Sequence, residues 1–171
     1  LTMIVAALET FALHLLPLWL TCAWLRTIFK DDLMRTFKTA DQHAVMQSWR
    51  KDFHRHPELG FDETRTSAKV ADLLVSFGLE VYRGIGKTGV VGVLQKGDGN
   101  ASIGLRADMD ALPIAEQTEV AHASKMPGIS HACGHDGHTA MLLGAAQYLA
   151  AQDAFSGRVV FIFQPAEEHG E

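Results

Sequence analysis

Three short runs of apolar, β-branched residues most constrain what this chain can fold into. They cover residues 89–94, 102–105 and 158–163, and each has the length and composition of a β-strand. A long loop, residues 108–136, and a helix-like stretch separate the second run from the third. Strand, loop, helix and strand in this order form an α/β crossover, which connects parallel strands. The sequence therefore predicts an α/β fold.

Two further helices are expected before the strands. The first begins at Asp41, which we expect to cap it, and ends at His56-Pro57 because proline disfavours a helical residue before it. The second covers residues 63–77, with Gly78 just past its C-terminal end. A turn at 97–100 predicts a hairpin between the first two strands. The residues expected to face the core are Ala44, Val45, Trp49 and Phe53, then Ala68, Ala71, Leu74 and Val75, and in the crossover helix Met141, Leu142, Ala145, Ala146 and Leu149.

The composition is that of an ordinary globular protein. Of the 171 residues, 47% are hydrophobic and 20% are charged, and 15 Lys+Arg against 20 Asp+Glu give a formal net charge of −5. This balance excludes a disordered chain and a broad basic surface for nucleic acid. The two cysteines, Cys22 and Cys133, lie far apart and do not indicate a disulfide framework. A reducing compartment is favoured, so we expect a cytoplasmic protein.

Residues 1–40 are set apart as an apolar leader and linker. The first 25 residues are largely apolar, but Glu9, His14 and Pro17 interrupt them, and the first basic residue is Arg26. A secretory signal carries its positive charge before the apolar stretch, which excludes that class of segment. Three interpretations stay open: a start extended beyond the natural one, a membrane anchor, or a docked amphipathic helix. The first is preferred, so no membrane partner is expected.

Residues 84–89 (GIGKTG) match the G-x-G-x-x-G pattern of dinucleotide-binding loops. That pattern must open a helix, but here a predicted strand follows it. The same residues contain Gly-Lys-Thr, yet a phosphate-binding P-loop needs a glycine where Val81 stands. We therefore interpret the segment as a glycine-rich turn that enters a strand.

Potential metal ligands gather in residues 131–138 (HACGHDGH). Three histidines, a cysteine and an aspartate fall within eight residues, and Gly134 and Gly137 let the backbone fold around a small centre. Paired C-x-x-C spacing is absent from the sequence, which disfavours a structural zinc finger. The alternative is a buried cysteine with surface histidines that lead into a helix.

Acidic residues follow two of the predicted strands. Asp108 and Asp110 come after the second strand, and Glu167 and Glu168 come after the third. Open α/β sheets bind ligands at the carboxyl ends of their strands, where one acid can hold a cation while another moves a proton. Taken alone, such acids are also typical of turns and helix N-termini. Together with the histidine-rich segment, and without a Ser-His nucleophile arrangement, they indicate metal-assisted hydrolysis rather than covalent catalysis.

Four motifs together resemble one family. In chain order they are HRHPELG (54–60), RADMDALP (106–113), HACGHDGH (131–138) and QPAEE (164–168). They are similar to motifs of the M20-type metallopeptidases, in the amidohydrolase branch that contains hippurate, N-acyl-amino-acid and auxin-conjugate hydrolases. The resemblance covers residues 41–171. It implies the N-terminal part of a zinc-peptidase-like catalytic domain, an α/β fold with a mixed sheet flanked by helices.

The resemblance also implies a site for two divalent metal ions, Zn or Mn, with Co or Ni as alternatives. Cys133, His135 and Glu168 would be ligands, and Glu167 the general base that takes a proton from water and passes it to the leaving amine. Asp110 matches an acid of the family that fixes the geometry of the metal site. The substrate would be a small N-acyl amino acid.

Other polar residues of these motifs are assigned to the surroundings of the site. Asp108 is expected beside the metal ligands, and so is His138, which we do not expect to bind metal. His54 and His56 are expected in the structure around the site or at its rim.

Members of the family continue beyond the Glu-Glu motif into a lid or dimerisation domain and further histidine ligands. The sequence ends three residues after Glu168, so we expect an incomplete catalytic domain, truncated before that part. A homodimer stays open for the full-length protein. The alternative function is an inactive fragment that at most binds a metal ion.

Overall fold

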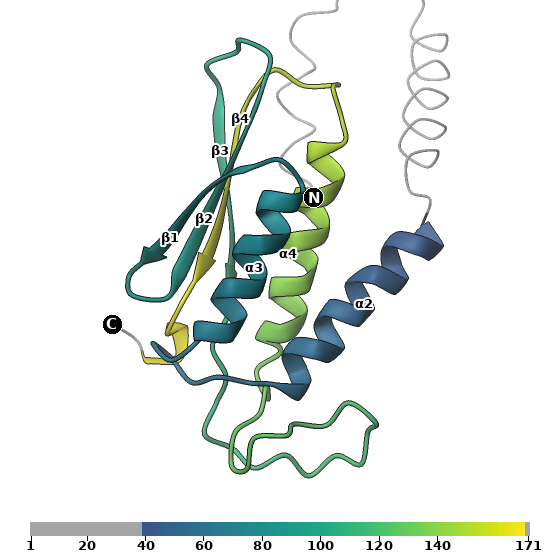
Figure 1. Cartoon of the computed structure of the whole chain (residues 1–171), viewed down its shortest axis with the longest axis vertical. Helices are drawn as coiled ribbons and strands as arrows, with labels where there is room; N and C mark the ends of the chain where they lie inside the picture. The colour runs from purple at the N-terminus through teal and green to yellow at the C-terminus, as the bar shows by residue number, and fades with distance from the viewer. Residues whose placement is uncertain (1–38, 170–171) are drawn as a thin grey trace, which may run out of the picture. The chain divides into compact units, whose positions relative to one another are not determined.

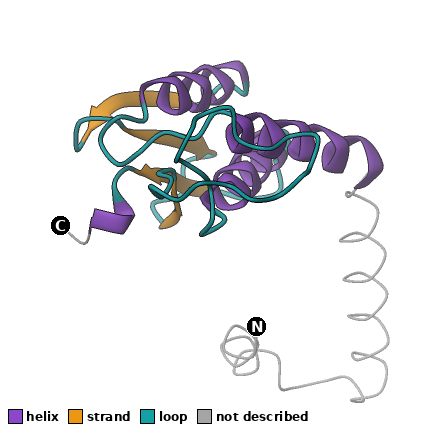
Figure 2. Ribbon diagram, turned by 90° about the horizontal axis from the view of Figure 1, so that it is seen from below, coloured by secondary structure: helices purple, strands orange, loops and turns teal. Residues whose placement is uncertain are grey.

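A computed structural model describes residues 39–169, and the expectations for the apolar leader lie outside the described residues. The described part is a four-stranded mixed sheet with three helices on one face (Figures 1 and 2). The elements are α2 (Thr39–Arg55), α3 (Thr64–Ser76), β1 (Glu80–Ile85), β2 (Gly89–Lys96), β3 (Ser102–Asp108), α4 (His135–Ala150), β4 (Gly157–Gln164) and the 3-10 helix η2 (Glu167–His169). The predicted α/β class is confirmed. None of the described helices is long and apolar enough to cross a membrane.

The strand order in the sheet is β1-β2-β4-β3. β4 pairs antiparallel with β2 and parallel with β3, so the β3–α4–β4 crossover is confirmed. The hairpin expected around residues 97–100 is wrong, because β4 lies between the two strands that this turn connects. β4 buries Phe161 and Phe163 and therefore takes a central position, whereas β3, with Ile103 57% exposed, suits the edge.

β1 is a strand that the sequence analysis does not predict. It pairs antiparallel with β2 across the turn at 86–88, so the interpretation of residues 84–89 as a turn entering a strand is confirmed. β1 lies at the sheet edge, and all of its residues except Val81 are exposed. An exposed edge strand shows little apolar alternation, which is why the sequence pattern does not reveal it.

The helices and the sheet enclose one apolar core. Its largest buried side chains include Phe53 of α2, Leu74 of α3, Leu143 of α4, and Phe161 and Phe163 of β4, each at most 1% exposed. Members of the core thus come from all three helices and from the most apolar strand. Burial of this size is the main contribution that stabilises the described fold.

The helix limits agree with the prediction, but several details are corrected. α2 begins at Thr39, so Asp41 lies in its first turn and not at its cap, where its charge still favours the helix dipole. Gly78, with a φ of 86°, follows α3 as predicted, because glycine adopts this conformation without a Cβ clash. Residues expected in the core that are exposed instead are Ala44, Val45, Ala68, Val75 and Met141. They lie beside the stripe that packs inward, in which Val70 and Leu143 take the core positions.

The burial pattern of α4 predicts a large and a small effect for two apolar residues that lie two positions apart. Leu143→Ala, at a fully buried position, should lower the free energy of unfolding by about 2–5 kcal/mol, because it leaves a cavity. Met141→Ala, at a position 56% exposed, should change it by less than about 0.5 kcal/mol. Urea titrations of the 171-residue chain measure both. Equal losses for the two variants would contradict the packing of α4.

Candidate metal centre

The candidate site lies where β3 and β4 end, at the lower end of Figure 1. The two strands are parallel neighbours, and their last residues, Asp108 and Gln164, are paired in register. The Met109 N–H donates to the Gln164 carbonyl oxygen at 3.0 Å, which extends the pairing of the two strands one residue beyond Asp108. Residues 109–134 leave this edge as a loop and return to it where α4 begins. The segments predicted to carry the chemistry therefore converge at the carboxyl edge of the sheet.

His135 is the first residue of α4, and its side chain is 2% exposed. Its Nδ1 lies 2.9 Å from the carbonyl oxygen of Asp110. A carbonyl oxygen can only accept, so Nδ1 carries a proton and donates it to this bond. The bond fixes the orientation of the ring and leaves Nε2 as the nitrogen that can bind a cation.

Three carboxylates surround Nε2 of His135. The distances are 3.6 Å to Asp108 Oδ1, 3.8 Å to Glu167 Oε2 and 3.6 Å to Glu168 Oε1, all beyond hydrogen-bond distance. Within residues 41–169, His135 is the only Lys, Arg or His side chain within 4 Å of either glutamate carboxylate. Asp108 also lies 3.4 Å from Nη1 of Arg106, so the charge left unbalanced among these residues is that of the two glutamates. Carboxylates without a basic partner beside an imidazole nitrogen can bind a metal cation.

Cys133, His135 and Glu168, the ligands that the family resemblance implies, lie together at the site. One ligand atom from each lies within 4.8 Å of the other two. Cys133 is exposed, and its pKa is raised, first by the hydrogen bond to the Glu168 carboxylate and then by burial and nearby acids. Asp108, His135 and His138 form a second group with the same spacing. The described residues thus hold two candidate ligand sets that share His135.

Asp110 tethers two of the site residues. It is 1% exposed, and its Oδ2 accepts the backbone N–H of Glu168 at 3.0 Å while its carbonyl accepts the Nδ1 proton of His135. Its Oδ1 is buried without a hydrogen-bond partner and lies 3.3 Å from the same Nδ1. Asp110 thereby fixes the orientation of the His135 ring and the position of the η2 backbone at Glu168.

His138 lies against the outer side of the site. Its Nδ1 lies 2.8 Å from Oδ1 of Asp108, and its ring stacks on His135 with centroids 5.6 Å apart. Burial alone would raise the pKa of Asp108, but the hydrogen bond from His138 and the charges of the two histidines outweigh it and lower the pKa. The structure therefore places His138 next to the site through Asp108, and Asp108 itself next to His135.

His54 connects three parts of the fold behind the site. Its Nδ1 lies 2.9 Å from Asp136 Oδ2 on α4, and its Nε2 lies 3.0 Å from Glu116 Oε1 in the 109–134 loop. Burial alone would lower the pKa of His54, but the hydrogen bonds to Glu116 and then Asp136 outweigh it and raise the pKa. Arg50 adds a second contact to Asp136 at 3.1 Å. Because Asp136 follows His135, this network supports the site from α2.

The two remaining histidines of the motifs have different surroundings. His56 bonds through Nδ1 to the Asp52 carbonyl oxygen at 2.9 Å, which terminates α2 and assigns this residue to the surrounding structure. His131 is 5% exposed, and neither of its ring nitrogens has a hydrogen-bond partner. Burial lowers the pKa of His131 to about 4, so the ring is neutral at pH 7.

Sequence reasoning missed the residues that support the site from a distance. Asp136 and Glu116 hold His54, and Glu63, which is fully buried, accepts the backbone N–H of Ala166 at 2.8 Å. Asp136 lies inside a quoted motif, but only the structure shows its partner. Glu63 carried one signal, an acidic residue directly before a helix, which ordinarily indicates a cap.

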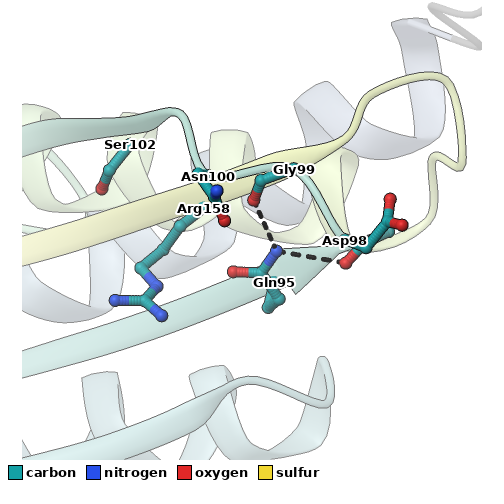
Figure 3. A pocket seen from close by; sticks show the side chains of 7 residues that line it. Gln95, Asp98, Gly99, Asn100, Ser102 and Arg158 are labelled. Carbon is teal, nitrogen blue, oxygen red and sulfur yellow. Dashed lines mark hydrogen bonds between the residues drawn. The ribbon is translucent and has the colours of Figure 1, made fainter.

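A pocket of about 400 Å³ lies at the opposite end of the sheet (Figure 3). It is lined by Gln95, Asp98, Asn100, Ser102 and Arg158 among others. The Gln95 amide donates to the carbonyl oxygens of Gly97 and Gly99 at 3.2 and 3.3 Å. This pocket contains none of the candidate ligands, and the Gln95 side chain in it stabilises the turn at 97–100. The pocket is therefore distinct from the metal centre.

Comparison with known proteins decides which family this arrangement represents. The model of peptidase family M20/M25/M40 matches residues 104–171, which contain every candidate ligand. The hippurate hydrolase of Campylobacter jejuni is 56% identical over 128 residues, 75% of this chain and 33% of that protein. The chain belongs to the M20 peptidase family. 

Other M20 relatives support the same assignment. The N-acyl-L-amino acid amidohydrolase of Geobacillus stearothermophilus is 49% identical over 141 residues, 81% of this chain and 37% of that protein. The YXEP protein of Bacillus subtilis, described as a dinuclear metal-binding peptidase of the M20 family, superposes with a TM-score of 0.72 and 42% identity. The superposition covers 76% of this chain and 37% of that one. The chain thus spans about a third of the length of the M20 relatives it matches.

The His54 network predicts a pH-dependent stability of this M20 chain. His54 has a raised pKa in the folded state, so its contribution is fully present below its ordinary value of 6.5 and is lost as pH rises through the raised value. The loss of unfolding free energy in His54→Gln should therefore be larger at pH 6 than at pH 8.5. Urea unfolding of both proteins across this range measures it, with His43→Gln on the exposed side of α2 as the matched control. A difference that grows with pH would contradict the ion pairs of His54.

Proposed function

We propose that this chain carries the metal-binding and proton-transfer groups of an amidohydrolase that cleaves the amide bond of N-acyl amino acids. The observation that carries the proposal is Nε2 of His135, which faces three carboxylates beside Cys133. The similarity to a hippurate hydrolase and an N-acyl-L-amino acid amidohydrolase supports the reaction, since hippurate is itself an N-acyl amino acid.

Cys133, His135 and Glu168 would hold a divalent cation. Sulfur, imidazole nitrogen and carboxylate oxygen are all ligands that Zn²⁺ accepts, and a set of three leaves a position open for water or substrate. The acids around His135 and the fixed Nδ1 tautomer fit such an ion. We propose Zn or Mn, with Co or Ni as alternatives, and a second ion by analogy with the dinuclear YXEP protein. A cation bound here would polarise the substrate carbonyl and make water more acidic.

Glu167 is the proposed general base. Its side chain is 37% exposed, whereas that of Glu168 is 25% exposed, so Glu167 is the more accessible of the adjacent acids. It would take a proton from the water whose oxygen bonds to the amide carbon, and give that proton to the amine nitrogen as the C–N bond breaks. Asp110 would contribute by orientation, because it holds both the His135 ring and the Glu168 backbone.

A second candidate is a segment that binds a metal ion without turnover. The two ligand groups among the described residues share His135, and its Nε2 can bind one ion at a time. The described residues therefore complete one three-ligand set rather than two. Release of glycine from hippurate by the metal-loaded chain distinguishes the candidates, since Co²⁺ binding without glycine release supports the second.

Metal binding is tested at the sulfur ligand. The chain should bind Co²⁺ with a near-ultraviolet thiolate-to-metal absorption band, and Cys133→Ser should abolish the band and weaken binding by at least about tenfold. Calorimetric and spectroscopic Co²⁺ titrations measure the two effects. Cys22→Ser, the same change at the other cysteine, is the control. An unchanged band in Cys133→Ser would remove Cys133 from the ligand set.

The two adjacent glutamates should separate binding from catalysis. Glu167→Gln should lower hippurate hydrolysis by about 10²–10⁴-fold, because it loses the general base, and should keep Co²⁺ affinity within about threefold. Glu168→Gln should weaken Co²⁺ affinity by at least about tenfold, because a ligand is lost. Glycine release and Co²⁺ titration measure the two properties for each variant. The reverse pattern would exchange the roles of Glu167 and Glu168.

A further inference from the structure

Glu63 is a fully buried acid that the proposed chemistry does not use. It stands directly before α3, yet its side chain makes no hydrogen bond that caps this helix. Its Oε1 instead accepts the backbone N–H of Ala166 at 2.8 Å, a contact between residues 103 positions apart. Its Oε2 accepts the hydroxyl of Thr88. A buried carboxylate that turns away from its own helix is directed at the segment leading to Glu167.

Backbone strain collects around this carboxylate. Among the described residues, three that are not glycine have a positive φ: Phe61 at 65°, Lys87 at 78° and Ala166 at 50°. Phe61 lies two residues before Glu63, Lys87 precedes its partner Thr88, and Ala166 is its other partner. Side chains other than glycine avoid this conformation because of the Cβ atom, and it persists only where the surroundings impose it.

The conformation of Ala166 sets the direction of the two glutamates that follow. Glu63 holds the N–H of Ala166, and Asp110 holds the N–H of Glu168 at 3.0 Å, so the segment is fixed on both sides of Glu167. From this position the two glutamate carboxylates reach to 3.8 and 3.6 Å from Nε2 of His135.

We propose that Glu63 is a positioning residue, which holds Ala166 in its left-handed conformation and thereby aims Glu167 and Glu168 at His135. The consequence for metal binding rests on the proposed function, but the effect on the turn does not. What matters is the reach of the side chain, because its two terminal atoms must each meet a separate partner, the N–H of Ala166 and the hydroxyl of Thr88.

Two substitutions separate reach from charge. Glu63→Gln removes the charge but keeps the length: its carbonyl oxygen can accept from Ala166, and its amide can donate to the Thr88 hydroxyl. Glu63→Asp keeps the charge but is one methylene shorter, so it can cap α3 and cannot reach Ala166. Both variants retain a polar residue before α3, which favours folding of each.

Amide hydrogen exchange of the metal-free 171-residue chain, followed by NMR, is the first measurement. Exchange of the Ala166 amide should be faster by at least about tenfold in Glu63→Asp and near the wild-type rate in Glu63→Gln. The amide of Val160, in the middle of β4, should keep its rate in both variants. Equal acceleration at Ala166 and Val160 would show a loss of global stability and overturn the proposal. Unchanged exchange at Ala166 in Glu63→Asp would overturn it as well.

Co²⁺ affinity is the second measurement, and it separates this inference from the proposed function. Glu63→Asp should bind Co²⁺ at least about tenfold more weakly than the wild-type chain, whereas Glu63→Gln should restore most of the affinity. If Glu63→Asp binds Co²⁺ as tightly as wild type, Glu63 does not position the ligands. If the wild-type chain binds no Co²⁺, the proposed function fails, and the exchange result alone decides the role of Glu63.

Discussion

The site depends on one hydrogen bond, from Nδ1 of His135 to the carbonyl oxygen of Asp110 at 2.9 Å. This bond fixes the ring and directs Nε2 toward the acids at the ends of β3 and β4. It forms only because the two strands are parallel neighbours, so that the residues after each strand meet where α4 begins. The crossover therefore does more than complete the sheet, since it places a nitrogen ligand, a thiol and several carboxylates at one edge.

Most of the fold can be predicted from the sequence because its elements have strong local patterns. The apolar run of β4 and the glycine after α3 specify a strand and a helix end without tertiary information. Strand order cannot be read in this way. The turn at 97–100 looks the same whether its strands pair with each other or accept β4 between them, and that choice depends on the burial of Phe161 and Phe163. β1 escapes prediction because five of its six residues are exposed.

The candidate ligands can be predicted in two steps: potential ligands gather in the short segment that contains Cys133 and His135, and the resemblance to the family assigns the individual ligands. Their support cannot, because it is made by contacts between distant parts of the chain. His54 reaches Asp136 across 82 positions, and Glu63 reaches Ala166 across 103. Neither pairing has a sequence signature, since an acid before a helix ordinarily indicates a cap and a histidine in a helix indicates nothing specific. The sequence therefore indicates which atoms could bind a cation, and the fold shows what holds them in place.

The proposed function requires that Cys133, His135 and Glu168 together hold one divalent cation. X-ray absorption at the zinc edge of the chain loaded with one equivalent of Zn²⁺ tests it most directly, because this method reports the ligand atoms themselves. One sulfur is expected at about 2.3 Å, together with nitrogen or oxygen neighbours at about 2.0–2.2 Å that include the scattering pattern of an imidazole ring. A spectrum with nitrogen and oxygen neighbours but no sulfur would contradict it.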